Sequence, residues 1–197
     1  MATRGRPSKA TEQRQRVLTG AAEIFSRRGY RATTMNEIAA EVGLSKPTLY
    51  HYFHNKEELL IRLYEDVMNE SLATALLIAK TVPAPLEALR QLIAYRVRYT
   101  CENQAIHKVF FEEEEELPAH LLDTVVDRRR QFEDVMKDLV ARHLAASGRT
   151  LQTSETVFVN TCLGAANWVY KWYAPNGPLE PEQLGKDIAD LVLLPLL

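Results

Sequence analysis

The chain has 197 residues, of which 46% are hydrophobic and 25% are charged, and its formal net charge is −2. This balance is typical of a globular chain of one or two domains, and it excludes disordered and collagen-like classes. The sequence contains no apolar run long enough to span a bilayer, so no membrane partner is expected. Its basic start lacks the apolar stretch of a signal peptide.

The two cysteines, Cys101 and Cys162, are far apart and form no C-x-x-C pair. We therefore expect neither a disulfide framework nor a structural zinc site, and we expect a cytoplasmic protein. Both cysteines are predicted to be small buried apolar residues.

Charge is distributed unevenly along the chain. Residues 1–52 carry nine Lys or Arg and four Asp or Glu, whereas the remainder carries fifteen basic and twenty-two acidic residues. A basic N-terminal part attached to a larger acidic part suggests that the first part meets a polyanion.

Every long segment repeats its apolar residues with the helical period, and no strand pattern is present. The capping pattern Thr34-Met-Asn-Glu37 marks one helix start, and glycines and prolines mark several ends. In chain order, helices are predicted through Val17–Phe25, from Thr34 to about Gly43, from Ser45 to about Tyr52, from Asn55 to Pro83, across Leu86–Thr100, from Ile106 to about Pro118, across Leu121–Leu144, across Phe158–Trp172 and across Leu184–Val192. The predicted fold class is all-α, with about nine helices.

The second and third helices have the spacing of a helix-turn-helix, because Gly43 suits the tight turn between them. In such a unit the second helix lies in the DNA major groove. Lys46 can donate to guanine, Thr48 can use its hydroxyl or methyl, and Pro47 offers an apolar face to a thymine methyl. Thr34 and Lys56 are expected to hold phosphates at helix N-termini, and Arg4 and Arg6 to reach a minor groove. The predicted DNA contacts are Thr34, Asn36, Ser45, Lys46, Pro47, Thr48, Tyr50, His51, Tyr52, Lys56, Arg4 and Arg6.

The stretch from Thr34 to Leu59 resembles the signature of TetR-family transcriptional regulators. The matching positions are Ile38-Ala39, Gly43, Ser45, Leu49-Tyr50, Phe53, Lys56 and Leu59, and the likeness covers roughly residues 12–60. Val42 and Pro47 depart mildly from the usual pattern. The resemblance implies a DNA-binding domain at residues 1–54, with a basic arm at 1–9, and a ligand-binding and dimerisation domain at 55–197. It also implies a homodimer through the last two helices, a palindromic DNA operator and a small-molecule effector that releases the protein from the operator.

A looser likeness concerns the segments Asn167–Leu179 and Phe110–Pro118 and the arginine-rich seventh helix. These look like the branch of the family that represses fatty-acid, sterol or aromatic degradation genes and responds to an acyl-CoA thioester. Such a ligand needs an apolar slot and cations for its phosphates. Candidates for the slot are Phe110, Trp168, Trp172 and Tyr99, and candidates for the cations are Arg96, Arg98, Arg128, Arg129, Arg130 and Lys171.

Other interpretations of the same residues remain open. Trp168 and Trp172 also fit a plain core or a dimer interface. Most of the run Glu112–Glu116 is expected to be a solvated face, although one member such as Glu113 could meet a cationic ligand, as in a drug-efflux repressor. His107, Glu113 and His120 are irregularly spaced, so no metal site is expected.

The sequence argues against two further functional classes. No nucleophile elbow, P-loop, dinucleotide fingerprint or H-E-x-x-H stretch occurs, so neither an enzyme nor a cofactor is expected. An adaptor that has lost DNA binding is disfavoured by the intact set of Lys46, Tyr50, His51 and Lys56.

Overall fold

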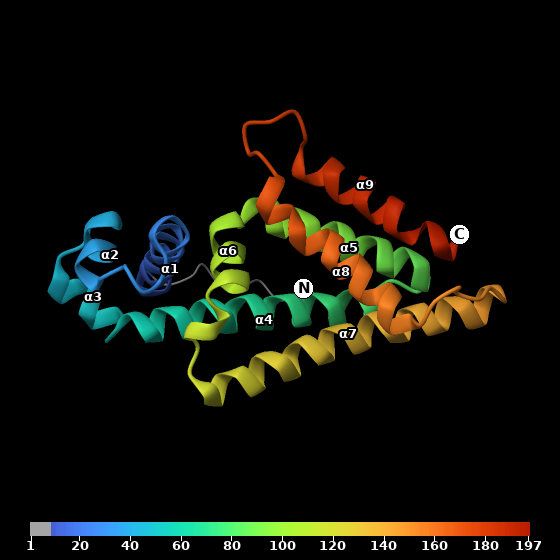
Figure 1. Ribbon diagram of the computed structural model, residues 1–197, viewed down its shortest axis with the longest axis horizontal. Helices are drawn as coiled ribbons and strands as arrows, with labels where there is room; N and C mark the ends of the chain where they lie inside the picture. The colour runs from blue at the N-terminus through green and yellow to red at the C-terminus, as the bar shows by residue number, and fades with distance from the viewer. Residues whose placement is uncertain (1–8) are drawn as a thin grey trace.

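The computed structural model describes residues 9–197, and all regular structure in that part of the chain is helical (Figure 1). The predicted all-α class is therefore confirmed, whereas Arg4 and Arg6 lie outside the described residues. The helices are α1 (Lys9–Arg28), α2 (Met35–Glu41), α3 (Lys46–Tyr52), α4 (Lys56–Thr81), α5 (Pro85–Glu102), α6 (Gln104–Glu112), α7 (Ala119–Ser147), α8 (Glu155–Trp172) and α9 (Pro181–Leu193), with short 3₁₀ turns η1 (Glu114–Glu116) and η2 (Leu194–Leu196).

Helices α1 to α3 form a small unit at one end of the molecule, which we call the head (Figure 1). The predicted capping box is present, because Thr34 Oγ1 accepts from the Glu37 amide and the Glu37 carboxylate accepts from the Thr34 amide. Gly43 adopts φ +64° in the turn between α2 and α3, a conformation that a side chain would strain. Gly20 of α1 lets α2 approach closely, since a Cβ there would lie 2.3 Å from Val42 Cγ1.

The remaining helices form the body. Helix α4 starts in the head and runs beneath the body, with α7 beside it, while α5, α8 and α9 pack above (Figure 1). Helices α5 and α9 touch at the backbone: a Cβ on Gly185 would lie 2.7 Å from the Ala94 carbonyl oxygen. Helix α6 stands between the head and the body and packs against α1 and α8.

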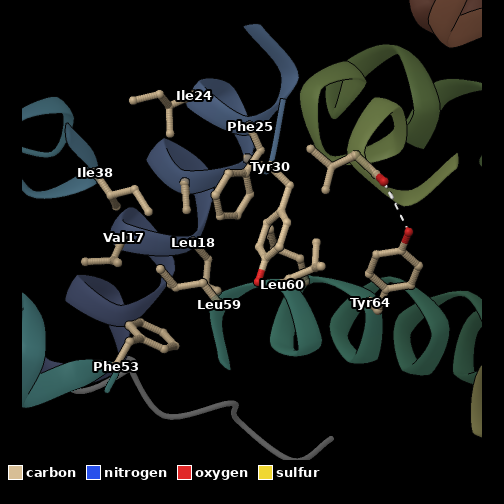
Figure 2. Close-up of a cluster of buried hydrophobic side chains, with 14 of the residues drawn as sticks. Val17, Leu18, Ile24, Phe25, Tyr30, Ile38, Phe53, Leu59, Leu60 and Tyr64 are labelled. Atoms are coloured by element: carbon tan, nitrogen blue, oxygen red, sulfur yellow. Dashed lines mark hydrogen bonds between the residues drawn. The ribbon is translucent and has the colours of Figure 1, made fainter. Parts of the chain in front are cut away.

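The hydrophobic core of the head continues into α4 and α6. Phe25, Ile38 and Phe53 share one buried cluster with Leu60 and Tyr64 of α4 (Figure 2). Tyr64 points towards α6, where its hydroxyl donates to the carbonyl oxygens of Val109 and Phe110 at 3.2 and 2.9 Å. The core thus crosses the expected domain boundary at residue 54, and apolar packing connects the head to the body together with polar contacts such as that of Tyr30 with Glu113.

The glutamate run differs from the expectation. Helix α6 stops at Glu112, instead of continuing towards Pro118, and the run turns through η1. Its carboxylates bind different elements: Glu113 accepts from the Tyr30 amide, Glu114 pairs with Arg129, and Glu116 pairs with Arg31. These three partners lie in different directions, and the tight turn allows each carboxylate to reach its own partner. Most carboxylates of the run therefore bind residues of other elements, and the run is not a free solvated face.

Candidate functional site

Helix α3 presents an exposed polar surface at the end of the head. Leu49 and Phe53 are fully buried and fix the helix to the core. The outward residues are exposed, and Lys46 Nζ lies 5.8 Å from the centre of the Tyr50 ring. Of the predicted DNA contacts, the exposed ones are Thr34, Asn36, Ser45, Lys46, Pro47, Thr48, Tyr50 and His51, whereas Tyr52 is half-buried beside the core. This surface has the shape and the donors that major-groove recognition requires.

The hydroxyl groups at two helix starts have local partners. Ser45 Oγ caps α3 by accepting from the Thr48 amide and lies 2.7 Å from Thr48 Oγ1. Thr34 Oγ1 donates to Glu37 Oε2. These local bonds are helix caps, and both capping side chains are exposed.

Lys56 has a structural role that the sequence analysis missed. Its ammonium donates to the carbonyl oxygens of Tyr30, Arg31 and Thr33 at 2.9, 3.1 and 3.1 Å, and it lies 4.4 Å from the centre of the Tyr30 ring. These acceptors use all the N–H groups of a lysine. Lys56 therefore joins α4 to the segment after α1, and its ammonium has no donor left for a phosphate.

The body contains a cavity of about 420 Å³, a size within the range of small-ligand sites. It is bounded by α4, α5, α6, α7 and α8. Its lining residues are Met68, Ser71, Arg96, Phe110, Phe111, Glu114, Arg128, Arg129, Phe132, Glu133, Asn160, Leu163, Gly164 and Asn167. We call this space the body cavity.

The inner end of the body cavity combines buried apolar side chains with one buried cation and its two polar partners. Met68, Phe110 and Phe132 are buried there, and Arg96 is 6% exposed. Arg96 Nε donates to Asn167 Oδ1 at 2.8 Å, and its Nη1 donates to Ser71 Oγ at 2.7 Å. Burial lowers the pKa of Arg96 to about 10, so the guanidinium remains charged at neutral pH.

The outer end of the cavity carries arginines from α7. Arg129 donates to Glu114 from both terminal nitrogens of its guanidinium, at 3.0 and 2.5 Å. Among residues 9–197, Arg128 donates one hydrogen bond, to the side-chain oxygen of Gln131 at 3.4 Å. The outer end of the cavity therefore carries one arginine paired with a carboxylate, Arg129, and one arginine, Arg128, without a carboxylate partner in the described part of the chain.

Several predicted ligand residues do not reach the body cavity. Of the candidates, Arg96, Phe110, Arg128 and Arg129 line it. Glu113 faces α1 through the Tyr30 amide, and Lys171 pairs with Glu112. The other candidates outside the cavity are Tyr99, Arg98, Arg130, Trp168 and Trp172. Arg96 belongs to the inner end, so it is placed for a buried group and not for the phosphates of CoA.

Trp168 and Trp172 lie on an exposed face of α8, with 59% and 48% of their surface accessible. The same face carries Val157, and Leu191 of the neighbouring α9 and Leu194 of η2 are also exposed. We call these five residues the interface stripe. Apolar side chains gathered on two adjacent helices are typical of a protein contact surface.

Two classes of site find no support in residues 9–197. That part of the chain holds no group of three His, Cys, Asp or Glu that could bind a metal ion. Its helices are also too short or too polar to cross a membrane. His107 is buried and His120 is exposed on α7.

Models of known families match both parts of the chain. Residues 17–63 match "Bacterial regulatory proteins, tetR family", and residues 83–196 match "Tetracyclin repressor-like, C-terminal domain". The second match alone covers more than half of the sequence.

Individual proteins are similar over nearly the whole length. The transcriptional repressor KstR2 of Mycolicibacterium smegmatis is 28% identical over 95% of this chain and 92% of its own length. The structure of KstR2 of Mycobacterium tuberculosis, described as a ketosteroid transcriptional regulator, matches with a TM-score of 0.84 at 25% identity, covering 92% of this chain and 93% of that one. AibR, solved with isovaleryl coenzyme A and operator DNA, matches with a TM-score of 0.78 at 25% identity, covering 93% of this chain and 99% of that one.

Proposed function

The chain belongs to the TetR family of bacterial transcriptional regulators, and from that premise we propose that it represses catabolic genes as a homodimer. In this proposal the dimer leaves a palindromic operator when an acyl-CoA thioester binds the body cavity. The helix-turn-helix supplies the DNA-binding activity of the family. The regulated genes in this proposal concern fatty-acid, sterol or aromatic degradation.

The arrangement of the body cavity carries the ligand proposal. A thioester of CoA joins an apolar acyl group to a polyanionic nucleotide, so it needs an apolar interior beside a basic entrance. Phe110 and Phe132 provide the first, and Arg128 provides a cation at the second, next to Arg129, which a phosphate would have to share with Glu114. A cavity of about 420 Å³ suits the acyl group, with the nucleotide left at the rim.

The related proteins support the same ligand class. AibR was solved with an acyl-CoA thioester and operator DNA, and KstR2 is named for ketosteroids. The alternative is a repressor of a drug-efflux gene that senses lipophilic or cationic compounds. A cationic compound receives less support, because it needs a free carboxylate, whereas a lipophilic one is separated from a thioester by the binding test below. Glu114 is paired with Arg129, and Glu133 lies 3.7 Å from Lys137.

Contacts between α6 and α4 offer a route from the cavity to the head. Phe110 lines the cavity, and the carbonyl oxygen of the same residue accepts from Tyr64. Tyr64 also belongs to the head core. A ligand that moves Phe110 therefore changes the packing beneath the head, and effector and operator lower one another's affinity by one coupling free energy.

The test uses purified protein and a duplex selected from a random pool. Hexanoyl-CoA, isovaleryl-CoA and octanoyl-CoA are titrated by calorimetry, with free CoA and the free acids as controls. We expect a thioester to bind and to release the duplex in fluorescence anisotropy, whereas neither half alone does so. Replacement of both Arg128 and Arg129 by Met should weaken thioester binding more than duplex binding, and the double replacement of the exposed Arg130 and Arg142 is the matched control. Release by cationic dyes alone, or no duplex preference at all, would overturn the proposal.

A further inference from the structure

Arg96 is a buried cation without a carboxylate partner. Within residues 9–197 no Asp or Glu pairs with it, and its two hydrogen-bond partners, Asn167 and Ser71, are neutral. A buried charge is stable only when hydrogen bonds or an opposite charge replace the lost water. The two neutral acceptors meet part of this need and leave the positive charge unbalanced.

The acidic residues of the body cavity do not supply the missing charge. Glu114 is held by both terminal nitrogens of Arg129, and Glu133 lies beside Lys137. The charged or polar groups that affect Arg96 most are Tyr99, Tyr95 and Arg129, and Arg129 repels it. The inner end of the cavity is therefore a region of uncompensated positive potential.

The Arg96 guanidinium is fixed in position, and some of its N–H groups have no acceptor in the described part of the chain. Ser71 and Asn167 accept from Nη1 and Nε, and the Phe132 ring centre lies 5.8 Å from Cζ. A guanidinium carries five N–H groups, and those on Nη2 have no acceptor among residues 9–197. Arg96 lines the cavity, so an acceptor atom of a bound molecule can reach it without repacking the core.

We propose that the inner end of the body cavity binds an oxygen at the far end of the effector's acyl group, a carboxylate or a keto oxygen, through Arg96 held by Ser71 and Asn167. This inference rests on the proposed function and narrows its ligand class. A plain hydrocarbon chain would leave the buried cation without an acceptor, whereas an oxygenated acyl group would satisfy it. Arg96 then selects oxygenated acyl thioesters over hydrocarbon ones.

The experiment compares acyl groups of equal length. Hexanoyl-CoA, 5-oxohexanoyl-CoA and the mono-CoA thioester of hexanedioic acid are titrated by calorimetry into the full chain. The variants are Arg96→Met, which removes the cation, and Asn167→Asp, which gives it a carboxylate partner. Arg98→Met is the matched control, because Arg98 lies on the same helix outside the body cavity and pairs with Glu182. Urea unfolding of each variant checks that it folds.

We expect the wild type to bind the oxygenated thioesters about tenfold to hundredfold more tightly than hexanoyl-CoA, as for a hydrogen bond to a charged group. In Arg96→Met the three thioesters should bind with about equal affinity. In Asn167→Asp the preference for the carboxylate thioester should disappear. Arg98→Met should keep the preference for both oxygenated thioesters. Equal binding of all three thioesters by the wild type overturns the inference and leaves the proposed function standing. An equal loss for all three in Arg96→Met also overturns it, because Arg96 would then contact the part that they share.

If no thioester binds, the proposed function fails, and a CoA-free pair decides the inference. Benzoate and toluene are compared by ligand-observed NMR in the wild type and in Arg96→Met. Benzoate binding that depends on Arg96 supports an oxygen site at the inner end. Absence of benzoate binding, or binding that the variant keeps, overturns it.

Discussion

Lys46 and Lys56 are two lysines of one DNA-binding region whose ammonium groups have different surroundings. Lys46 is exposed on α3, whereas Lys56 donates to three backbone carbonyls after α1. Lys56→Met should lower the free energy of unfolding by about 2 kcal/mol, since hydrogen bonds from a charged group are lost and the carbonyls lose their partner. Thermal unfolding measures this change.

Lys46→Met is the matched control for that substitution. It should leave the unfolding midpoint within about a degree and still weaken duplex binding by about tenfold, because a base or phosphate contact is removed. Equal stability of the two variants would contradict the role that we assign to Lys56.

His107 on α6 makes stability depend on pH. It is fully buried between Tyr99 and Phe111, and both ring nitrogens lack a hydrogen-bond partner within residues 9–197. Burial, and secondly the charge of Arg96, hold the pKa of His107 well below its ordinary value of 6.5. Below pH 6.5 His107 therefore binds a proton in the unfolded chain but not in the folded chain, and the free energy of unfolding decreases as the pH falls.

Between pH 7.5 and 5.5 this group should cost about 1 kcal/mol of unfolding free energy. Glu37 and Glu58, whose pKa values are lowered by hydrogen bonds with Thr34 and His54, act only at more acidic pH, below the ordinary value of 4.5. Replacement His107→Phe should flatten the dependence, whereas replacement of the exposed His120 by Gln should not. Urea unfolding at three pH values measures both, and an unchanged slope in the Phe variant would contradict the assignment.

At the scale of elements, the closest contact in the body is between α5 and α9. A Cβ on Gly185 would meet the backbone of Ala94 at 2.7 Å, and backbone cannot move aside as a side chain can. Gly185→Ala should therefore destabilise the chain by about 1–3 kcal/mol, even though alanine favours helix by about 1 kcal/mol. Urea unfolding tests this. The neighbouring exposed Lys186→Ala should change stability by less than about 0.5 kcal/mol, and an equal effect of the two would contradict the close approach.

Helix boundaries could be predicted well from the sequence, because caps and apolar spacing are local. The capping box at Thr34 and the turn at Gly43 both lie where expected. The end of α6 could not be predicted, because the partners of Glu113 and Glu116 lie more than eighty residues earlier in the chain. The directions of these carboxylates depend on tertiary contacts that no local pattern contains.

The position of Trp168 and Trp172 shows a different limit. Helix α8 is apolar on two faces: Phe158, Cys162 and Val169 face the core, and the tryptophans face outward. Periodicity identifies a face but cannot tell the core from a contact surface when both are apolar. The sequence likewise does not separate Arg96 from the surface arginines of the chain, since its burial depends on contacts with α4 and α8.

At the scale of the whole molecule, the interface stripe suggests how two chains associate. Stable interfaces place a hydrophobic centre on such surfaces, and a helix-turn-helix dimer needs both heads on one duplex about 34 Å apart. Trp168→Glu or Leu191→Glu should therefore convert the dimer to a monomer in sedimentation and reduce duplex affinity by at least a hundredfold, through loss of bivalent binding.

Val126→Glu is the matched control for these substitutions, because Val126 is 48% exposed on α7 and is not part of the stripe. It should leave the sedimentation and the duplex affinity unchanged. Because the charge is added to exposed positions, the two stripe variants should keep the helical circular dichroism spectrum of the wild type, which separates dissociation from unfolding. If both remained dimeric with full duplex affinity, the chains would have to associate through another surface, and the apolar face of α8 and α9 would need a different partner.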